Sequence, residues 1–161
     1  MKERESLDKD TIGKSFSSAV QDVVGTMAGI EVIEINSDNV DQNKADVDQI
    51  SGAMLLLGTV NSMMSITLSS EAASTLVSYM TGISASDLES EELFDGVAEL
   101  VNMICGRVKA ILAGSEFHFK LTSPFAVTGR NHMIIHKTKV AKLIKRYDAG
   151  EWDIVLKVFF L

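Results

Sequence analysis

The side chains best suited to chemistry in this sequence are Asp95, Glu99 and Asn102, which follow one another at helical spacing. Because each residue of an α-helix turns by about 100°, these positions lie on one side of a helix, and Gly106 and Lys109 continue the same line. A carboxamide donates and accepts hydrogen bonds without carrying charge, and a carboxylate pairs with Lys or Arg. We therefore predict that this polar line is the working surface of the protein.

The rest of the segment 94–109 is apolar apart from Arg107, so the polar line is narrow. The apolar positions are Phe94, Val97, Leu100, Val101, Ile104 and Val108, and they continue at Ile111 and Leu112. A helix with so narrow a polar face must be enclosed by protein on its other sides, which presents the polar groups rigidly, as catalysis by positioning requires. The alternative interpretation is that the line is only the solvated edge of a core helix.

Composition indicates a single globular domain. The chain has 161 residues, of which 46% are hydrophobic and one is proline, so it can bury a core of its own. Its net charge of -7 disfavours nucleic acid and anionic membranes as partners and suits a partner with exposed Lys or Arg. No apolar run reaches the ~18 residues that span a bilayer, and the N-terminus lacks the apolar region of a signal peptide. We therefore expect a cytoplasmic protein that binds neither nucleic acid nor membrane.

Hydrophobic periodicity predicts elements in the order helix, three strands, short helix, long helix, three strands. Residues 1–13 are highly charged and are expected to be a flexible lead-in to one domain over 14–161, built from pseudo-repeats at about 14–82 and 86–161. A capping box at Ser86-x-x-Glu89 should precede the long helix. The expected helices are 15–28, 70–80 and 91–113, and the expected strands are 31–36, two within 52–68, 116–127, 138–147 and 152–160.

The two predicted repeats differ at the polar line. Superposing their long helices places Gln21 opposite Glu99 and Val24 opposite Asn102. Core packing does not require this difference, so the second repeat holds a polar pair that the first lacks.

Several motifs lie in the order of the predicted elements: the hairpin segment 48–60, Ser70-Glu-x-Ala, Asp95-x-x-x-Glu99-x-x-Asn102, Gly106-x-x-Lys109 and Gly129-Arg-Asn-His132. Together they resemble the CheC/CheX family of chemotaxis phosphatases, and its CheX members most closely, over residues 14–161. The resemblance implies an α+β, CheC-like, pseudo-duplicated fold in which two long helices pack on a mostly antiparallel six-stranded sheet. It also implies a homodimer and a partner, the phosphorylated receiver of a CheY-type response regulator.

The resemblance distinguishes two branches of the family. CheC-like members commonly hold two Glu-x-x-Asn motifs, whereas CheX-like members hold one on the central helix, as this chain does. Members often show Gly-Asn-x-Lys after the motif, and Arg107 departs from that pattern. This departure puts the dimer contact and the preferred regulator in question.

By this resemblance, the protein is a hydrolase that removes the aspartyl phosphate of the regulator by inserting Glu99 and Asn102 into the receiver active site. Asn102 would orient the attacking water, because a neutral amide does not repel a phosphoryl group, and Glu99 would pair with a receiver Lys or Arg. Asp95, Gly106 and Lys109 are expected to make secondary partner contacts. Helix packing explains Gly106 equally well, and the helix dipole and solvation are alternative explanations for Asp95 and Lys109.

We predict no metal site in the chain. His132 and His136 lie in a segment of strand or loop character, where their spacing does not bring two rings together, and His118 supplies no apparent third ligand. Cys105 is expected to be a buried core residue and not a nucleophile. No cofactor is expected here, and the Mg²⁺ that supports hydrolysis is expected in the partner receiver.

The sequence leaves two other functions open. One is a non-enzymatic module that binds a receiver or a flagellar component, and the other is an assembly module that associates through a sheet edge or the apolar strand 155–161. The phosphatase alone predicts faster loss of phosphate from the regulator.

Overall fold

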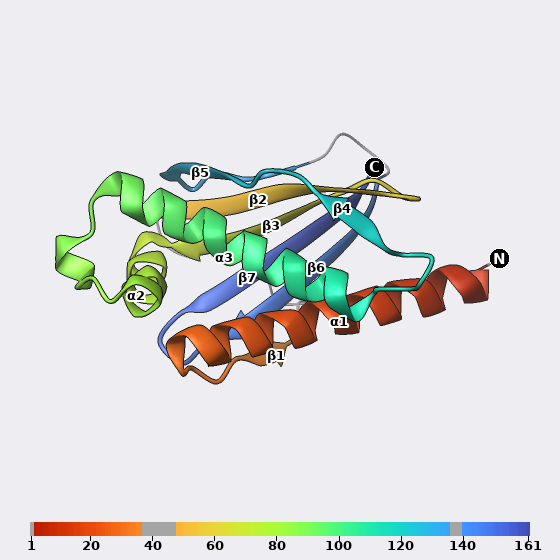
Figure 1. Ribbon diagram of the computed structural model, residues 1–161, viewed down its shortest axis with the longest axis horizontal. Helices are drawn as coiled ribbons and strands as arrows, with labels where there is room; N and C mark the ends of the chain where they lie inside the picture. The colour runs from red at the N-terminus through yellow and green to blue at the C-terminus, as the bar shows by residue number, and fades with distance from the viewer. Residues whose placement is uncertain (1, 37–47, 136–139) are drawn as a thin grey trace.

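The computed structural model describes residues 2–36, 48–135 and 140–161, which form α-helices on one face of an antiparallel sheet (Figure 1). In chain order the elements are α1 (Lys2–Ala28), β1 (Ile33–Ile35), β2 (Asp48–Gly58), β3 (Ser62–Ser69), α2 (Ser70–Thr81), the 3-10 helix η2 (Ala85–Asp87), α3 (Ser90–Ile111), β4 (Phe119–Leu121), β5 (Phe125–Arg130), β6 (Ala141–Asp148) and β7 (Asp153–Phe160). The long helices α1 and α3 run antiparallel, and α2 contacts both at one end (Figure 1). The predicted α+β class is confirmed. None of the helices in these ranges is long and apolar enough to cross a membrane.

The sheet is arranged symmetrically about its central strands, β7 and β3. The strand order is β1-β6-β7-β3-β2-β4, β5 also pairs with β2, and all these pairings are antiparallel. The halves of the chain are interleaved, because β1 of the first half pairs with β6 of the second, while β4 and β5 of the second half pair with β2 of the first. Each half therefore completes the sheet of the other.

The sequence predicted six strands, but the described residues form seven, because the segment 119–130 gives two strands instead of one. β4 pairs with the last residues of β2, whereas β5 pairs with its first residues. Pro124 lies between β4 and β5, and it lacks the backbone N–H that a continuous ladder needs. Two strands, β4 and β5, therefore pair along this side of β2.

Helix α1 begins at Lys2 and not near Ser15 as predicted, so most of the expected lead-in, residues 1–13, forms its first turns. The sequence interpretation gave too much weight to the charges of this segment. Lys, Glu, Arg and Leu are strong helix formers, and no proline interrupts them. Further along the helix, Lys14 Nζ lies 2.9 Å from Asp10 Oδ2, an i,i+4 ion pair on the helix surface.

The capping box of α3 lies one turn later than predicted. Glu89 is the N-cap, and its backbone N–H donates to the Glu92 carboxylate at 2.9 Å. Ser86, the predicted N-cap, lies instead in η2, where its hydroxyl bonds to neighbouring side chains. The long helix then covers nearly the predicted range.

Close contacts hold α3 against the sheet and against α2. Gly52 of β2 lies under α3, where an added Cβ would sit 2.5 Å from Val101 Cγ2 and 3.0 Å from the Val97 carbonyl oxygen. Gly96 lies just as tightly against the side chain of Val77 on α2. Because interiors are close-packed, these contacts fix the depth and rotation of α3 and leave its polar line on the outer side.

Candidate functional site on helix α3

The five predicted site residues lie together on the outer side of α3. Asp95, Glu99 and Lys109 are exposed, and Asn102 and Gly106 are partly exposed. The apolar residues on the opposite side of the helix are buried against β2, α1 and α2. The structure thus brings the whole predicted line to an accessible surface.

Glu99 and Asn102 contact each other, but only weakly. Asn102 Nδ2 donates to Glu99 Oε2 at 3.4 Å, which is long for a hydrogen bond. Neither side chain makes another hydrogen bond or ion pair within the described part of the chain. The amide oxygen of Asn102 and one carboxylate oxygen of Glu99 are therefore available to an incoming partner.

Gly106 lies one turn beyond Asn102 in open space. A Cβ added at Gly106 would meet no atom within 4 Å, leaving aside its own helix backbone. Close helix packing, one of the two explanations that the sequence offered, therefore does not account for this glycine. The other explanation for Gly106, close approach by the backbone of a partner, agrees with this open surface.

Arg107, the departure from the family pattern, points away from the polar line toward α1. Its Nε and Nη2 atoms lie 3.0 and 2.9 Å from Asp22 Oδ2. Sequence analysis missed this pair, because only the packing of α1 beside α3 brings the two residues together. Arg107 thus has a structural role in joining the long helices.

The equivalent residues on α1 make hydrogen bonds within the fold. Ser17, opposite Asp95 in the repeat alignment, is buried, and its hydroxyl donates to Glu34 at 2.6 Å. Gln21, opposite Glu99, donates from Nε2 to the Val32 carbonyl at 3.2 Å. The segment around β1 thus forms hydrogen bonds with the side chains that a second site on α1 would need.

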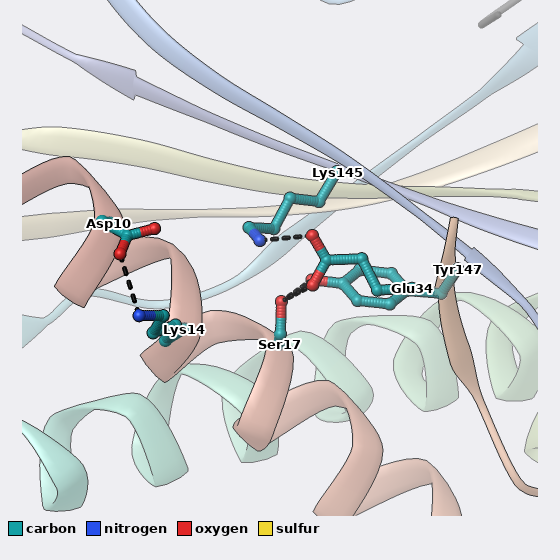
Figure 2. A network of polar contacts seen from close by, with 6 residues as sticks. All are labelled: Asp10, Lys14, Ser17, Glu34, Lys145 and Tyr147. Carbon is teal, nitrogen blue, oxygen red and sulfur yellow. Dashed lines mark hydrogen bonds and ion pairs between the residues drawn. The ribbon is translucent and has the colours of Figure 1, made fainter. Parts of the chain in front are cut away.

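Figure 2 shows how the contacts around Ser17 extend into the sheet. The Tyr147 hydroxyl lies 3.0 Å from Ser17 Oγ, and Lys145 Nζ lies 2.5 Å from Glu34 Oε1. Burial raises the pKa of Glu34, but hydrogen bonds from Lys145 and Ser17 and the charge of Lys145 outweigh it and leave that pKa below its usual value. Burial also raises the pKa of Tyr147. The network joins α1, β1 and β6 as a structural unit.

Cys105 lies on the buried side of α3 and is 0% exposed. Burial raises the pKa of its thiol to about 12. A thiol with this pKa is almost wholly protonated near neutral pH, so it cannot serve as a nucleophile. The expected core role is confirmed.

The described histidines make hydrogen bonds within the fold. His132 contacts the Gly129 carbonyl oxygen through Nδ1 at 3.0 Å and the Ser51 hydroxyl through Nε2 at 2.6 Å, which joins the end of β5 to β2. His118 Nδ1 contacts the Ser115 carbonyl oxygen at 3.2 Å. His136 lies outside the described residues. Over the described ranges, no group of three or more His, Cys, Asp or Glu side chains could hold a metal ion.

Residues 50–146 match the family model for chemotaxis phosphatase CheX. The chain belongs to the CheX family. The match extends from β2 into β6 and includes α3 with the whole polar line. No curated protein sequence matches the chain.

Solved structures share the fold over almost the whole chain. The chemotaxis protein CheX of Vibrio vulnificus is 29% identical, with a TM-score of 0.78 over 92% of this chain and 95% of that chain. A CheC-like superfamily protein from Shewanella sp. PV-4 is 26% identical, with a TM-score of 0.80 over 94% and 97%. A chain of the CheX-CheY-BeF3-Mg²⁺ complex from Borrelia burgdorferi is 22% identical, with a TM-score of 0.70 over 91% and 95%, and this likeness shows the fold alone.

Proposed function

We propose that the protein hydrolyses the aspartyl phosphate of a CheY-type response regulator by inserting Glu99 and Asn102 into the receiver active site. The observation that carries this proposal is the accessible, weakly bonded Glu99–Asn102 pair on a helix whose opposite side is buried, in a member of the CheX family. Because α3 is held against the sheet and α2, the pair is presented without rearrangement, which favours catalysis by positioning.

Asn102 positions the attacking water. Hydrolysis needs a water in line with the phosphorus, and the receiver's own Lys and Mg²⁺ handle the charge of the phosphoryl group. Since Asn102 already donates toward Glu99, its amide oxygen is the atom that accepts a hydrogen bond from this water. A carboxylate at the same place would repel the phosphoryl oxygens.

Glu99 and its neighbours dock the receiver. The Glu99 carboxylate pairs with a Lys or Arg at the rim of the phosphoryl pocket and fixes the register of α3. Asp95 and Lys109 make contacts further along the line, and the open surface at Gly106 admits the receiver backbone. The pairing of Arg107 with Asp22 leaves this docking surface clear.

The partner proposal draws on the B. burgdorferi complex, which contains CheX, CheY, BeF3 and Mg²⁺. We place the Mg²⁺ of the reaction in the receiver, with none held by this chain. We also propose that the protein acts in the cytoplasm, as a homodimer, where it meets its regulator.

The test is the rate of phosphate loss from phosphorylated response regulators of the same organism. Wild-type protein should accelerate the loss, and Asn102→Ala should reduce the acceleration by roughly 10²- to 10³-fold while retaining binding, because water positioning acts in the transition state. Glu99→Ala should weaken binding as well. Gln21→Ala, at the equivalent position on α1, is the matched control and should keep full activity.

The same experiment separates the phosphatase from a binding module. Equal decay with wild-type protein, Asn102→Ala and no added protein, across every regulator that binds, would contradict the proposal and leave non-enzymatic binding of the receiver as the function.

A further inference from the structure

A cavity of about 430 Å³ lies at the end of the domain opposite α2, between the first half of α1, the end of α3 and the ends of the central strands (Figure 1). This volume falls within the ~300–1,000 Å³ of small-molecule sites, which are mostly apolar. Leu112, which borders the cavity, lies about 15 Å along the helix direction from Asn102, at 1.5 Å per residue. The cavity is therefore separate from the polar line and takes no part in the proposed phosphatase mechanism.

The inner wall of the cavity is part of the hydrophobic core. Phe16 of α1, Leu56 of β2 and Val158 of β7 border the cavity and are 2%, 1% and 0% exposed. Val60 also borders it and is 53% exposed, so the cavity reaches from the core to the solvent. An apolar molecule that enters removes both its own surface and that of the wall from water. The cavity therefore favours a ligand with an apolar body.

Aromatic side chains are concentrated at this cavity. Four of the chain's seven phenylalanines border it, and they come from α1, from the segment after α3, from β4 and from β7: Phe16, Phe117, Phe119 and Phe160. Aromatic rings attract other rings in edge-to-face and offset arrangements, beyond the effect of the area that they bury. The lining therefore favours a planar aromatic ligand over a saturated one of the same size.

The charges at the cavity balance one another. Among the described residues that border it, Lys9 and Glu116 carry one charge of each sign, and both are exposed. His118 is exposed as well, and its Nδ1 contacts the Ser115 carbonyl oxygen. The buried residues of this wall include no charged side chain, so a charged ligand would lose hydration without gaining a partner. An uncharged ligand avoids that loss.

We propose that this cavity binds a small, uncharged, planar aromatic molecule. The rings of the ligand lie among the four phenylalanines and against the core residues Leu56 and Val158. The proposal stands apart from the phosphatase, because it uses none of the residues of the polar line.

The test is a fluorescence titration of the full chain with N-phenyl-1-naphthylamine, an uncharged dye that brightens in apolar surroundings. Its anionic analogue, 8-anilinonaphthalene-1-sulfonate, adds one sulfonate to the same skeleton. We expect saturable binding of one uncharged dye per chain and binding of the sulfonate that is weaker by roughly tenfold or more. In competition, 2-naphthol should displace the dye at roughly two- to tenfold lower concentration than its saturated counterpart, decahydro-2-naphthol.

Three variants locate the dye. Phe117→Leu keeps an apolar wall but removes one ring, so it should weaken dye binding by roughly two- to tenfold. Phe125→Leu is the matched control, because Phe125 is an exposed phenylalanine of β5 that does not border the cavity, and it should bind normally. Ala141 is exposed where it borders the cavity, so Ala141→Trp should block the dye without disturbing the core. Circular dichroism checks that each variant is folded.

Several results would overturn the proposal. They are dye binding that never saturates, equal affinity for the two dyes, and full binding by both Phe117→Leu and Ala141→Trp. Wild-type protein that binds no dye, as expected if a second copy of the chain covered the cavity, would overturn it too. Asn102→Ala should bind the dye normally, which keeps this outcome independent of the phosphatase.

Discussion

Arg107 on α3 and Asp22 on α1 form an ion pair that joins the two long helices, with Nε and Nη2 of the arginine 3.0 and 2.9 Å from the same carboxylate oxygen. The pair lies on the flank of α3, beside its polar line. Arg107, which departs from the family pattern, therefore has a partner within the fold. It is not one of the residues of the polar line.

The first prediction is that Arg107→Ala lowers the free energy of unfolding only slightly. Both side chains are about half exposed, at 51% and 47%, so the loss in free energy of unfolding should be about 0.2–1 kcal/mol. Urea unfolding of Arg107→Ala, Asp22→Ala and the double variant measures the coupling between the two residues. Phosphatase activity should be unchanged, and a large fall in kcat would place Arg107 in the reaction.

The second prediction uses Gly106 to separate stability from docking. Gly106→Ala adds a methyl group in open space within a helix, so it should stabilise the fold by about 0.5–1 kcal/mol. If the receiver backbone approaches here, the same methyl group should raise KM several-fold and leave kcat nearly unchanged. Unfolding and steady-state dephosphorylation measure the two effects.

Gly25→Ala on α1 is the matched control for Gly106→Ala. A Cβ at Gly25 would meet only the Ile30 carbonyl oxygen, at an ordinary 3.9 Å. It should therefore give a similar gain in stability without any change in KM. An unchanged KM for Gly106→Ala would argue that the receiver docks elsewhere.

The third prediction concerns Gly52, which has no room for a side chain. Gly52→Ala should destabilise the protein by about 1–3 kcal/mol, because the new methyl group meets Val101 and the Val97 carbonyl oxygen. The displaced helix should also lose phosphatase activity. Val101→Ala removes the nearest of these atoms, so the double variant should be more stable than the sum of the single effects. Simple additivity would show that the close contact is not the cause.

Sequence alone predicted the features that depend on local periodicity and turn chemistry. The spacing of Glu99 and Asn102 sufficed to place both on one accessible face, since helical geometry fixes that relation once the helix is identified. The short helix predicted over 70–80 ends as α2 at Thr81, and Gly82 follows it with φ 76°, a left-handed conformation that glycine adopts easily.

The sequence did not predict features that depend on how distant segments meet. The network of Ser17, Glu34 and Tyr147 joins residues from α1, β1 and β6, and no local pattern marks it. The contact of Arg107 with Asp22 likewise depends on the rotation of two packed helices. Gln21 and Val24 indicated that the first repeat lacks the polar pair, but the bond from Gln21 to the Val32 carbonyl needed the tertiary structure.

The fourth prediction is a pH dependence at Glu34. Since the folded pKa of Glu34 lies below its ordinary value of 4.5, its ionised form stabilises the fold above that pH, and this contribution is lost as pH falls through the folded pKa. Glu34→Gln should therefore be less stable than wild type at pH 7, by less than about 1 kcal/mol given its partial exposure. The difference should shrink toward pH 3.

Urea unfolding from pH 7 to pH 3 measures this dependence. Glu31→Gln is the control, because Glu31 is a nearby exposed carboxylate with no ion pair in the described ranges. Its difference from wild type should stay flat. A Glu34→Gln deficit that grows as the pH falls would reverse the sign of the proposed linkage.

The last prediction makes Cys105 a reporter on α3. With the thiol fully buried and its pKa raised to about 12, a disulfide reagent such as DTNB at pH 8 should react with the native protein only as fast as α3 opens. Unfolding in urea should restore the reactivity of an ordinary thiol. As control, Cys105→Ala combined with Ala110→Cys carries an exposed thiol on the same helix and should react at once. Fast labelling of native Cys105 would mean that α3 opens readily, and a helix so loosely held could not present Glu99 and Asn102 in a fixed geometry.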